Sequence, residues 1–121
     1  IVDGYNASRW AWDGLTIADQ RDRLISALCE LHARTGISIQ AVFDGDGDAQ
    51  TDASPTTLVP VRVIFSAREV EADDVVISRV SALPRESAVV VASNDNRVRE
   101  ACAAAGANLL TIAQLMGVLR R

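Results

Sequence analysis

The fold is decided most clearly by residues 88–95, which read Ala-Val-Val-Val-Ala-Ser-Asn-Asp. This apolar run is short, continuous and rich in Val, which is typical of a strand that is covered on both faces. Apolar residues then recur at helical spacing from Val98 to Ala105, and Gly106 ends the pattern. A buried strand followed by an amphipathic helix predicts one unit of a parallel α/β sheet.

The same alternation of strand and helix continues along the rest of the chain. We expect further strands at residues 1–2, 39–43, 61–65 and 109–110, and further helices at about residues 17–35, 75–83 and 112–119. This order predicts a three-layer α/β fold with a central parallel sheet and helices on both of its faces. Residues 45–60 contain almost nothing that could pack in a core, and they predict a flexible loop.

The composition is that of one globular domain, which we assign to residues 1–121. Hydrophobic residues make up 49% of the chain, but no apolar run approaches the roughly 18 residues that a membrane span requires. Cys29 and Cys102 lie in helical patterns without CxxC spacing, so we expect buried thiols and a cytoplasmic location. The chain starts within an apolar run and without Met, from which we expect a fragment of a longer protein.

Acidic residues are concentrated in the first part of the chain. The net charge is -4, and residues 1–52 carry nine acidic residues against four arginines. This overall acidity argues against a general nucleic-acid binder with a basic surface. Most of the acidic residues are Asp, although Glu is the better helix former. The excess of Asp predicts loop ends, helix caps or a metal site.

Aspartates follow the ends of several expected strands. Asp3 and Asp44 directly follow strands, Asp95 lies three positions after another, and Asp73 opens the helix after the third strand. Carboxyl ends of parallel strands meet at one edge of a sheet, where the ligands of such folds bind. Grouped carboxylates repel one another unless a cation lies among them. Oxygen ligands without His or Cys suit Mg²⁺ or Mn²⁺ rather than zinc, so the sequence predicts a divalent metal site.

Helix capping is the alternative role for two of these residues. Asp73 and Asp95 each precede an apolar helical period, and Asp is a favoured N-cap residue. Asp3 and Asp44 follow buried strands, and we expect no helix to begin at the residue after either of them. The sequence therefore leaves both roles open for Asp73 and Asp95.

Four short motifs are spread over nearly the whole chain. They are Ile-Val-Asp-Gly-Tyr-Asn at 1–6, Val-Phe-Asp-Gly at 42–45, Ala-Asp-Asp at 72–74 and Val-Ala-Ser-Asn-Asp-Asn at 91–96. In this order they resemble the motifs of NYN domains, and more narrowly those of the YacP-like branch in the PIN-like nuclease superfamily. The resemblance implies a PIN-like, Rossmann-like fold with strand order 3-2-1-4-5. It also implies a ribonuclease that depends on Mg²⁺ or Mn²⁺.

The resemblance further implies roles for individual residues. Asp3, Asp73 and Asp95 match the acidic residues that hold the metal and act in catalysis. Asn6 and Asp44 match two further catalytic positions, and Asn6 is expected to orient a water molecule or a substrate hydroxyl.

The sequence departs from the family pattern at two positions. Asp74 stands where relatives often have Ser or Thr, so Asp73 is the preferred ligand of that pair. Asn94 separates Ser93 from Asp95, where relatives commonly read Ser-Asp, and this leaves the alignment uncertain by one residue. We choose Asp95, because a carboxylate binds a metal directly as an anion.

Polar residues near these motifs are expected to bind the substrate. The candidates are Arg9, Arg21, Ser93, Asn96 and Arg97. Arg97 is favoured because it is two residues from Asp95 and because arginine commonly contacts phosphate. The alternative for each arginine is a solvated helix face or a surface ion pair. Ser93 could bind phosphate or brace a metal ligand. Trp10 and Trp12 could stack on unpaired bases or pack in the core.

Three functions compete for this pattern. The first is a metal-dependent endoribonuclease with RNA as its substrate and with the ribosome or other RNA-processing proteins as further candidate partners. The second is a non-catalytic RNA-binding module with the same fold, in which Asp-to-Asn changes would leave RNA affinity unchanged or raise it. The third is a phosphotransfer domain of the receiver type, which normally needs a Lys beside its Asp pocket. The chain has no Lys, so we rank this function last.

Overall fold

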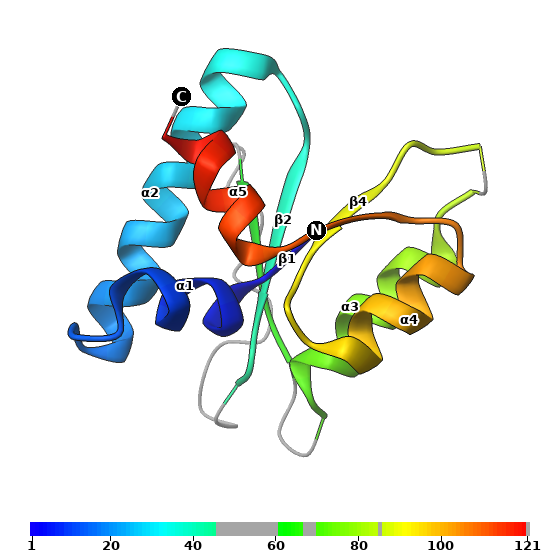
Figure 1. The fold of residues 1–121 in the computed structure, drawn as a ribbon, viewed down its shortest axis with the longest axis horizontal. Coiled ribbons are helices and arrows are strands. Elements are labelled where there is room, and N and C mark those ends of the chain that lie inside the picture. The colour runs from blue at the N-terminus through cyan, green and yellow to red at the C-terminus, as the bar shows by residue number, and fades with distance from the viewer. Residues whose placement is uncertain (46–60, 67–69, 85, 121) are drawn as a thin grey trace.

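The structure is a computed structural model that describes residues 1–45, 61–66, 70–84 and 86–120. Figure 1 shows a central sheet with helices on both sides. The strands are β1 (Val2–Asp3), β2 (Ile39–Phe43), β3 (Val61–Phe65), β4 (Val90–Ala92) and β5 (Asn108–Leu110). The helices are α1 (Gly4–Trp12), α2 (Ile17–Thr35), α3 (Ala72–Ala82), α4 (Asn96–Ala104) and α5 (Ile112–Leu119).

The five described strands form one parallel sheet in the order β3-β2-β1-β4-β5. The short strand β1 is central, and Val2 pairs with Ala41 of β2 on one side and with Ala92 of β4 on the other. The predicted fold class and strand order are confirmed. The strand order reverses beside β1, so the crevice where such folds bind ligands lies at the carboxyl ends of β1 and β4.

The strands supply alternate residues to two separate cores. Ile39, Ala41 and Phe43 of β2 pack in the core formed with α1, α2 and α5, whereas Val42 packs in the core formed with α3 and α4. This period of two is the pattern of a strand that is covered on both faces. The three predicted layers are therefore present.

The sequence does not predict α1, and the expectation that no helix follows Asp3 is wrong. Asp3 is the N-cap residue of α1 and has extended backbone angles, but its side chain accepts no capping hydrogen bond. The buried face of α1 consists of Gly4, Ala7 and Ser8. These residues are too small to produce an apolar period, but their size lets the helix pack closely on the sheet.

Gly4 is the point where α1 lies closest to β2. A Cβ atom on Gly4 would lie 2.5 Å from two carbons of the Phe43 ring and 2.8 Å from the carbonyl oxygen of Val42. Only glycine allows this approach, because the Val42 oxygen is backbone and the ring is held in the core. The close contact brings the start of α1 over the carboxyl end of β2.

We expect Gly4→Ala to destabilise the fold by about 1–3 kcal/mol, the usual effect of overpacking a core. Gly117→Ala is the matched control, because nothing lies within 4 Å of the added Cβ in α5. This change should stabilise the protein by about 0.5–1 kcal/mol through its effect on helix propensity. Urea unfolding followed by circular dichroism measures both effects. Effects of the same sign and size would contradict the proposed contact.

Three further expectations concern the cysteines, the loop at 45–60 and membrane-spanning segments. Cys102 is buried and Cys29 is half-buried, and both thiols are free. Of the predicted loop at 45–60, only Gly45 is described, and the rest lies outside the described residues. No helix in the described ranges combines the length and apolar character needed to cross a membrane.

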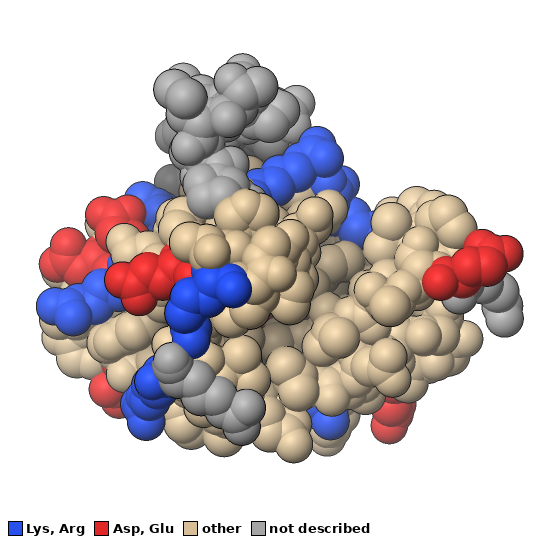
Figure 2. All heavy atoms as spheres, turned by 90° about the horizontal axis from the view of Figure 1, so that it is seen from above, with Lys and Arg blue, Asp and Glu red and all other residues tan. Residues whose placement is uncertain are grey.

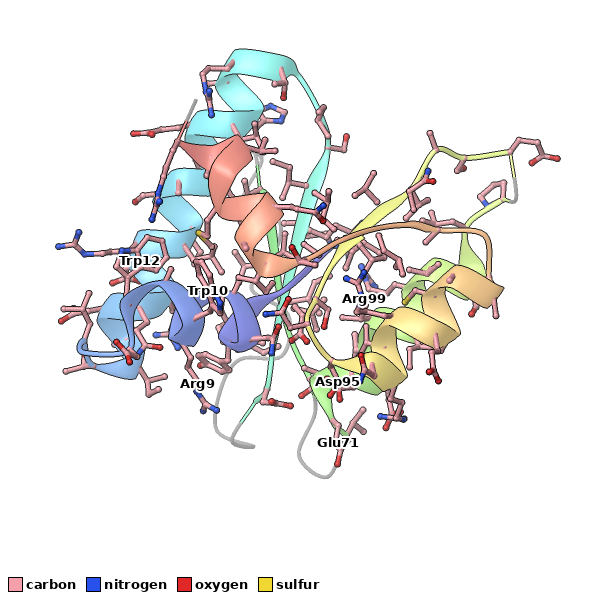
Figure 3. The ribbon with its side chains drawn as sticks, viewed as in Figure 1. Arg9, Trp10, Trp12, Glu71, Asp95 and Arg99 are labelled. Atoms are coloured by element: carbon pink, nitrogen blue, oxygen red, sulfur yellow. The ribbon has the colours of Figure 1, made fainter. Side chains whose placement is uncertain are left out.

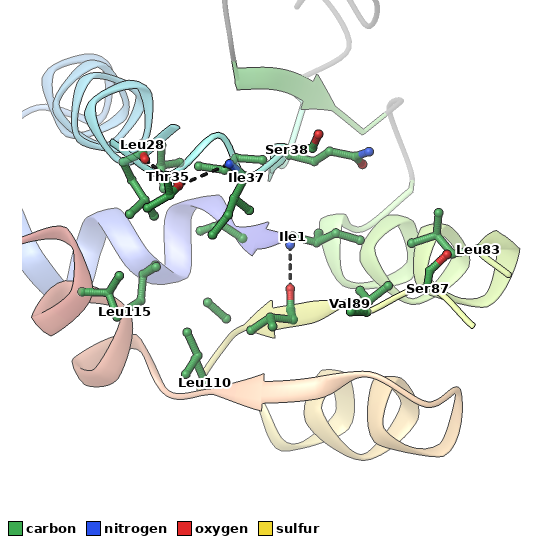
Figure 4. Close-up of a pocket in the computed structure, with 18 residues that line it drawn as sticks. Ile1, Leu28, Thr35, Ile37, Ser38, Leu83, Ser87, Val89, Leu110 and Leu115 are labelled. Atoms are coloured by element: carbon green, nitrogen blue, oxygen red, sulfur yellow. Dashed lines mark hydrogen bonds between the residues drawn. The ribbon is translucent and has the colours of Figure 1, made fainter. Parts of the chain in front are cut away.

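An apolar groove of about 450 Å³ opens at the amino ends of the strands. Its lining includes Leu28, Ile37, Val89, Leu110 and Leu115, as Figure 4 shows. Figure 2 looks onto this end of the molecule, where uncharged side chains occupy the centre and charged ones lie around the margins. The predicted aspartate site lies at the opposite, carboxyl ends of the strands, so the groove is separate from it.

Candidate active site

Four aspartates from separate parts of the chain meet at the carboxyl edge of the sheet. Asp3 ends β1, Asp44 follows β2, Asp73 lies in the first turn of α3, and Asp95 precedes α4. The charges of the other three act on Asp3, so the four carboxyl groups are close enough to repel one another. Figure 3 shows Asp95 and Glu71 at this end of the molecule.

Asp3 is the most deeply placed of these groups. It is 6% exposed, and its Oδ2 accepts a hydrogen bond of 3.0 Å from the Ser93 hydroxyl. Burial is the main reason that the pKa of Asp3 is raised from 3.8 to about 6. The charges of Asp73, Asp44 and Asp95 raise this pKa further, and the hydrogen bond from Ser93 opposes them. An ionised Asp3 is therefore held at an energetic cost.

The raised pKa predicts how stability depends on pH. The native state binds the Asp3 proton more tightly than the unfolded chain does, so stability falls as pH rises from about 4 through about 6. At pH 8 in EDTA we expect the free energy of unfolding of Asp3→Asn to exceed that of the wild type by about 1–3 kcal/mol. Urea unfolding measures this difference. As the pH falls from about 6 to about 4, the difference should shrink towards zero. A variant that is less stable at both pH values would show instead that the Asp3 carboxylate is a structural necessity.

Ser93 connects two of the aspartates. Its hydroxyl donates to Asp3 and accepts a hydrogen bond of 3.0 Å from the backbone N–H of Asp95. Its carbonyl oxygen accepts a hydrogen bond of 2.9 Å from Arg99. Ser93 is fully buried, so its placement favours the predicted role of bracing a ligand over that of touching phosphate.

Asn6 ties α1 to the loop between β4 and α4. Its Oδ1 accepts a hydrogen bond of 2.9 Å from the backbone N–H of Asn94. The Oδ1 of Asn94 in turn accepts a hydrogen bond of 2.9 Å from the N–H of Ile112, at the start of α5. In the sequence, Asn94 interrupts the fourth motif. In the structure, its hydrogen bonds connect α1, the loop between β4 and α4, and the start of α5.

Two of the aspartates cap helices. Asp95 Oδ1 accepts a hydrogen bond of 3.1 Å from the N–H of Val98 and caps α4. Asp44 Oδ1 accepts a hydrogen bond of 2.7 Å from the N–H of Ala72 and caps α3 from 28 positions away. Capping is thus the observed role of Asp95 and an unforeseen role of Asp44. Each cap uses one of the two oxygens of the carboxylate.

Asp73 does not cap α3, because the N-cap residue of that helix is Glu71. Its pKa is raised, first by burial and then by the charge of Asp95, while the Arg97 guanidinium lowers it. Asp73 is thus a second carboxylate that is held among other carboxylates.

Arg97 points to the first turn of α3. Its Nη1 lies 3.6 Å from Oε2 of Glu71 and 3.7 Å from Oδ2 of Asp73, and its Nη2 donates to Oδ1 of Asp74. The sequence offers Arg97 as a phosphate ligand or as part of a surface ion pair, and the structure shows ion pairs. Their partners could not be named from the sequence, because only the fold brings the starts of α3 and α4 together. Asn96, beside Arg97, is exposed at the start of α4.

Arg9 and Arg21 meet at Tyr5, which sequence reasoning also misses. The Arg9 guanidinium lies 5.6 Å from the centre of the Tyr5 ring, and Arg21 donates a hydrogen bond of 3.4 Å to the Tyr5 hydroxyl. Arg21 also lies 5.5 Å from the centre of the Phe65 ring, and the Tyr5 ring meets Phe43 edge-on at 4.8 Å. The spacing of four between Tyr5 and Arg9 would have indicated part of this cluster, had α1 been recognised as a helix.

The two tryptophans differ in burial. Trp12 packs against the core of α1, α2 and α5, whereas Trp10 is 50% exposed. Trp10 lies four positions after Asn6, on the same face of α1. Figure 3 shows both tryptophans and Arg9 on this helix. Trp10 is therefore the one of the pair that is open to a ligand.

The chemistry of the site fits a divalent cation, although the side chains are not closed around one. Asp3, Asp73 and Asp95 offer oxygen donors of the type that Mg²⁺ and Mn²⁺ prefer. Burial is the main cause of the raised pKa of Asp3 and of Asp73, and a cation would relieve the repulsion that adds to it. Among the described residues, no three Asp, Glu, His or Cys side chains are grouped closely enough to hold one ion. Binding of one ion by all three aspartates would therefore require at least one carboxylate to turn.

Comparison with known proteins supports the resemblance seen in the motifs. The family model of the YacP-like NYN domain matches residues 1–121. The crystal structure of Rae1 (YacP) from Bacillus subtilis is 27% identical with a TM-score of 0.76, and the match covers 98% of this chain and 71% of that one. A tryptophan-to-leucine variant of Rae1 gives 26% identity, a TM-score of 0.77 and coverages of 98% and 72%. No curated protein gives a significant match. The chain thus belongs to the YacP-like NYN domain family, a family of PIN-like nucleases.

Proposed function

We propose that this chain is a divalent-metal-dependent endoribonuclease whose active site is built on Asp3, Asp73 and Asp95. The observation that carries the proposal is the burial of Asp3 among other carboxylates, which raises its pKa to about 6. Such a group weakens the metal-free fold at neutral pH, and a bound cation would offset that cost. NYN and PIN-like nucleases generally use divalent metal ions, which agrees with this assignment.

Asp3, Asp73 and Asp95 are the residues that would hold Mg²⁺ or Mn²⁺. When bound, the ion would supply an activated water and would stabilise charge on the scissile phosphate. The protein contributes the negative charge that holds the ion and the orientation of the carboxylates. Ser93 orients Asp3 through its hydroxyl, and the same hydroxyl fixes the backbone of Asp95.

Asn6 and Asp44 support this site by positioning other residues. Asn6 holds the backbone of Asn94, next to Asp95, and so fixes the loop that presents that carboxylate. Asp44 caps the first turn of α3, which carries Asp73. Loss of either residue is expected to loosen the ligand arrangement without removing a ligand.

The RNA strand is proposed to pass along α1, beside the ends of β2 and β3. The exposed Arg9 and the partly buried Arg21 supply positive charge there, and Trp10 offers a ring on which an unpaired base could stack. The ribosome or other RNA-processing proteins as partners, and the cytoplasm as the location, stay predictions.

A non-catalytic RNA-binding module remains the second candidate. It is favoured by the capping roles of Asp44 and Asp95 and by the spacing of the carboxylates, which are not grouped around one point in the described residues. In this case the aspartates would serve the fold alone. Cleavage of RNA separates the two candidates.

We expect the chain to cleave labelled RNA with Mn²⁺ or Mg²⁺ and to lose this activity in EDTA. Asp3→Asn and Asp95→Asn should lower the rate by more than the roughly 10–100-fold that loss of a residue supporting a metal ligand causes. Asp22→Asn, at an exposed position of α2, is the matched control and should cleave like the wild type.

Gel electrophoresis of end-labelled RNA measures the rates, after circular dichroism has shown that each variant is folded. Cleavage that survives in folded Asp3→Asn contradicts the proposed site. RNA binding without cleavage, equal in wild type and variant, establishes the non-catalytic module instead.

We expect Arg9→Gln and Arg21→Gln to weaken RNA binding. Each lost phosphate contact should reduce the slope of log affinity against log salt by about 0.7, the value for single strands. Arg62→Gln is the control, because Arg62 is exposed near the beginning of β3, away from the carboxyl edge. Fluorescence anisotropy in EDTA measures binding without cleavage. Equal slopes for all four proteins would place the RNA elsewhere.

A further inference from the structure

We propose that Arg97 is an exchangeable cation of the active site. Without metal, its guanidinium forms ion pairs with carboxylates at the start of α3. When Asp73 binds a divalent metal ion, the Arg97 side chain is released and binds a phosphate of the RNA. The proposal rests on the proposed function, because it needs a metal ion at Asp73 and RNA as the substrate. It adds a coupling between the two that the family assignment does not contain.

Arg97 is surrounded by carboxylates from the start of α3. The guanidinium lies against Glu71, the N-cap residue of α3, and against Asp73 and Asp74 in the first turn of that helix. Arg97 itself is the second residue of α4. One positive charge thus faces three negative charges. Such a cluster keeps a net charge of -2, so a doubly charged ion is favoured over the singly charged guanidinium.

Asp73 cannot bind a metal ion and keep its ion pair with Arg97 unchanged. Its Oδ2 lies 3.7 Å from Nη1 of Arg97, and its carboxyl group is also influenced by Asp95 and Asp44 on the side of the sheet. It therefore lies between the guanidinium and the other carboxylates of the site. A metal ion held by Asp73 would place two like charges side by side, and their repulsion would move the more mobile one.

The Arg97 side chain can move without loss of buried contacts. Its side chain is 54% exposed, and the described contacts of its guanidinium are all with exposed or partly buried carboxylates. Ion pairs of this kind contribute little to stability, so breaking them is not expected to disturb the fold. By contrast, Arg99 on the same helix donates to the carbonyl oxygens of Ser93 and Leu110 and holds the backbone in place.

The released guanidinium can bind a phosphate close to the metal ligands. Arg97 lies two positions after Asp95, so it stays beside the metal ligands whichever way it turns. A guanidinium offers a planar pair of donors that matches the oxygens of a phosphate, and it keeps its charge at any physiological pH. A phosphate next to the scissile one would therefore replace the carboxylates that the metal ion has taken.

This exchange predicts effects of opposite sign on two affinities. In the RNA-free protein, Arg97→Gln should bind Mn²⁺ about three- to fivefold more tightly, the range that corresponds to an exposed ion pair. The same variant should bind RNA more weakly, with a salt slope reduced by about 0.7. Arg97→Lys keeps the charge and should bind Mn²⁺ like the wild type, and Arg62→Gln is the control for removing an arginine elsewhere.

Isothermal titration calorimetry with MnCl₂ measures the metal affinity, and fluorescence anisotropy of labelled single-stranded RNA in Ca²⁺ measures the RNA affinity. Tighter Mn²⁺ binding together with weaker RNA binding supports the exchange. Unchanged Mn²⁺ affinity in Arg97→Gln overturns it, and so does RNA binding that is unaffected by the change. A wild-type chain that binds no Mn²⁺ overturns the proposed function itself, which distinguishes that failure from a failure of the exchange alone.

Discussion

The contact between Gly4 and the Phe43 ring is the constraint on which the candidate site depends. Because β1 has only two residues and lies in the middle of the sheet, α1 begins directly over the end of β2. Asp3 is buried at that turn, and the next residues, Tyr5 and Asn6, are directed to the two sides of the crevice. A side chain at position 4 would push α1 away and separate these groups.

The same turn concentrates negative charge at a cost to stability. Asp3 accepts a hydrogen bond from Ser93, and Asp44 and Asp95 accept hydrogen bonds from the starts of α3 and α4. Arg97 offsets the negative charge of Asp73. The pKa of Asp3 nevertheless remains raised, mainly by burial and further by the charges of Asp73, Asp44 and Asp95. Functional sites often keep such local conflicts, which a fold selected only for stability would lose. The conflict is what makes this edge attractive to a cation.

Much of the fold could be predicted because its signals are local. The short runs at 39–43 and 61–65, each apolar except for one residue, predicted strands, and the helical periods closed by Gly36 and Gly106 predicted helices. Helix α1 could not be predicted from such local signals. Its buried face consists of small residues, and their contribution to the fold depends on what they pack against. For the site, the sequence predicted the meeting of the four aspartates from their positions at strand ends and helix starts. It could not predict that Asp44 caps a helix 28 positions away.

By itself, the sequence determined the strands and every helix except α1, the parallel sheet and the acidic residues at its carboxyl edge, because each of these follows from local patterns and from chain direction. Only the tertiary structure decided how the charges are shared. Whether Arg97 faces phosphate or Asp73, and whether Asn94 interrupts a motif or joins three elements, depends on groups that are distant in sequence and a few ångströms apart in space. Electrostatic and hydrogen-bond energies depend on those short distances, and residue order alone does not contain them.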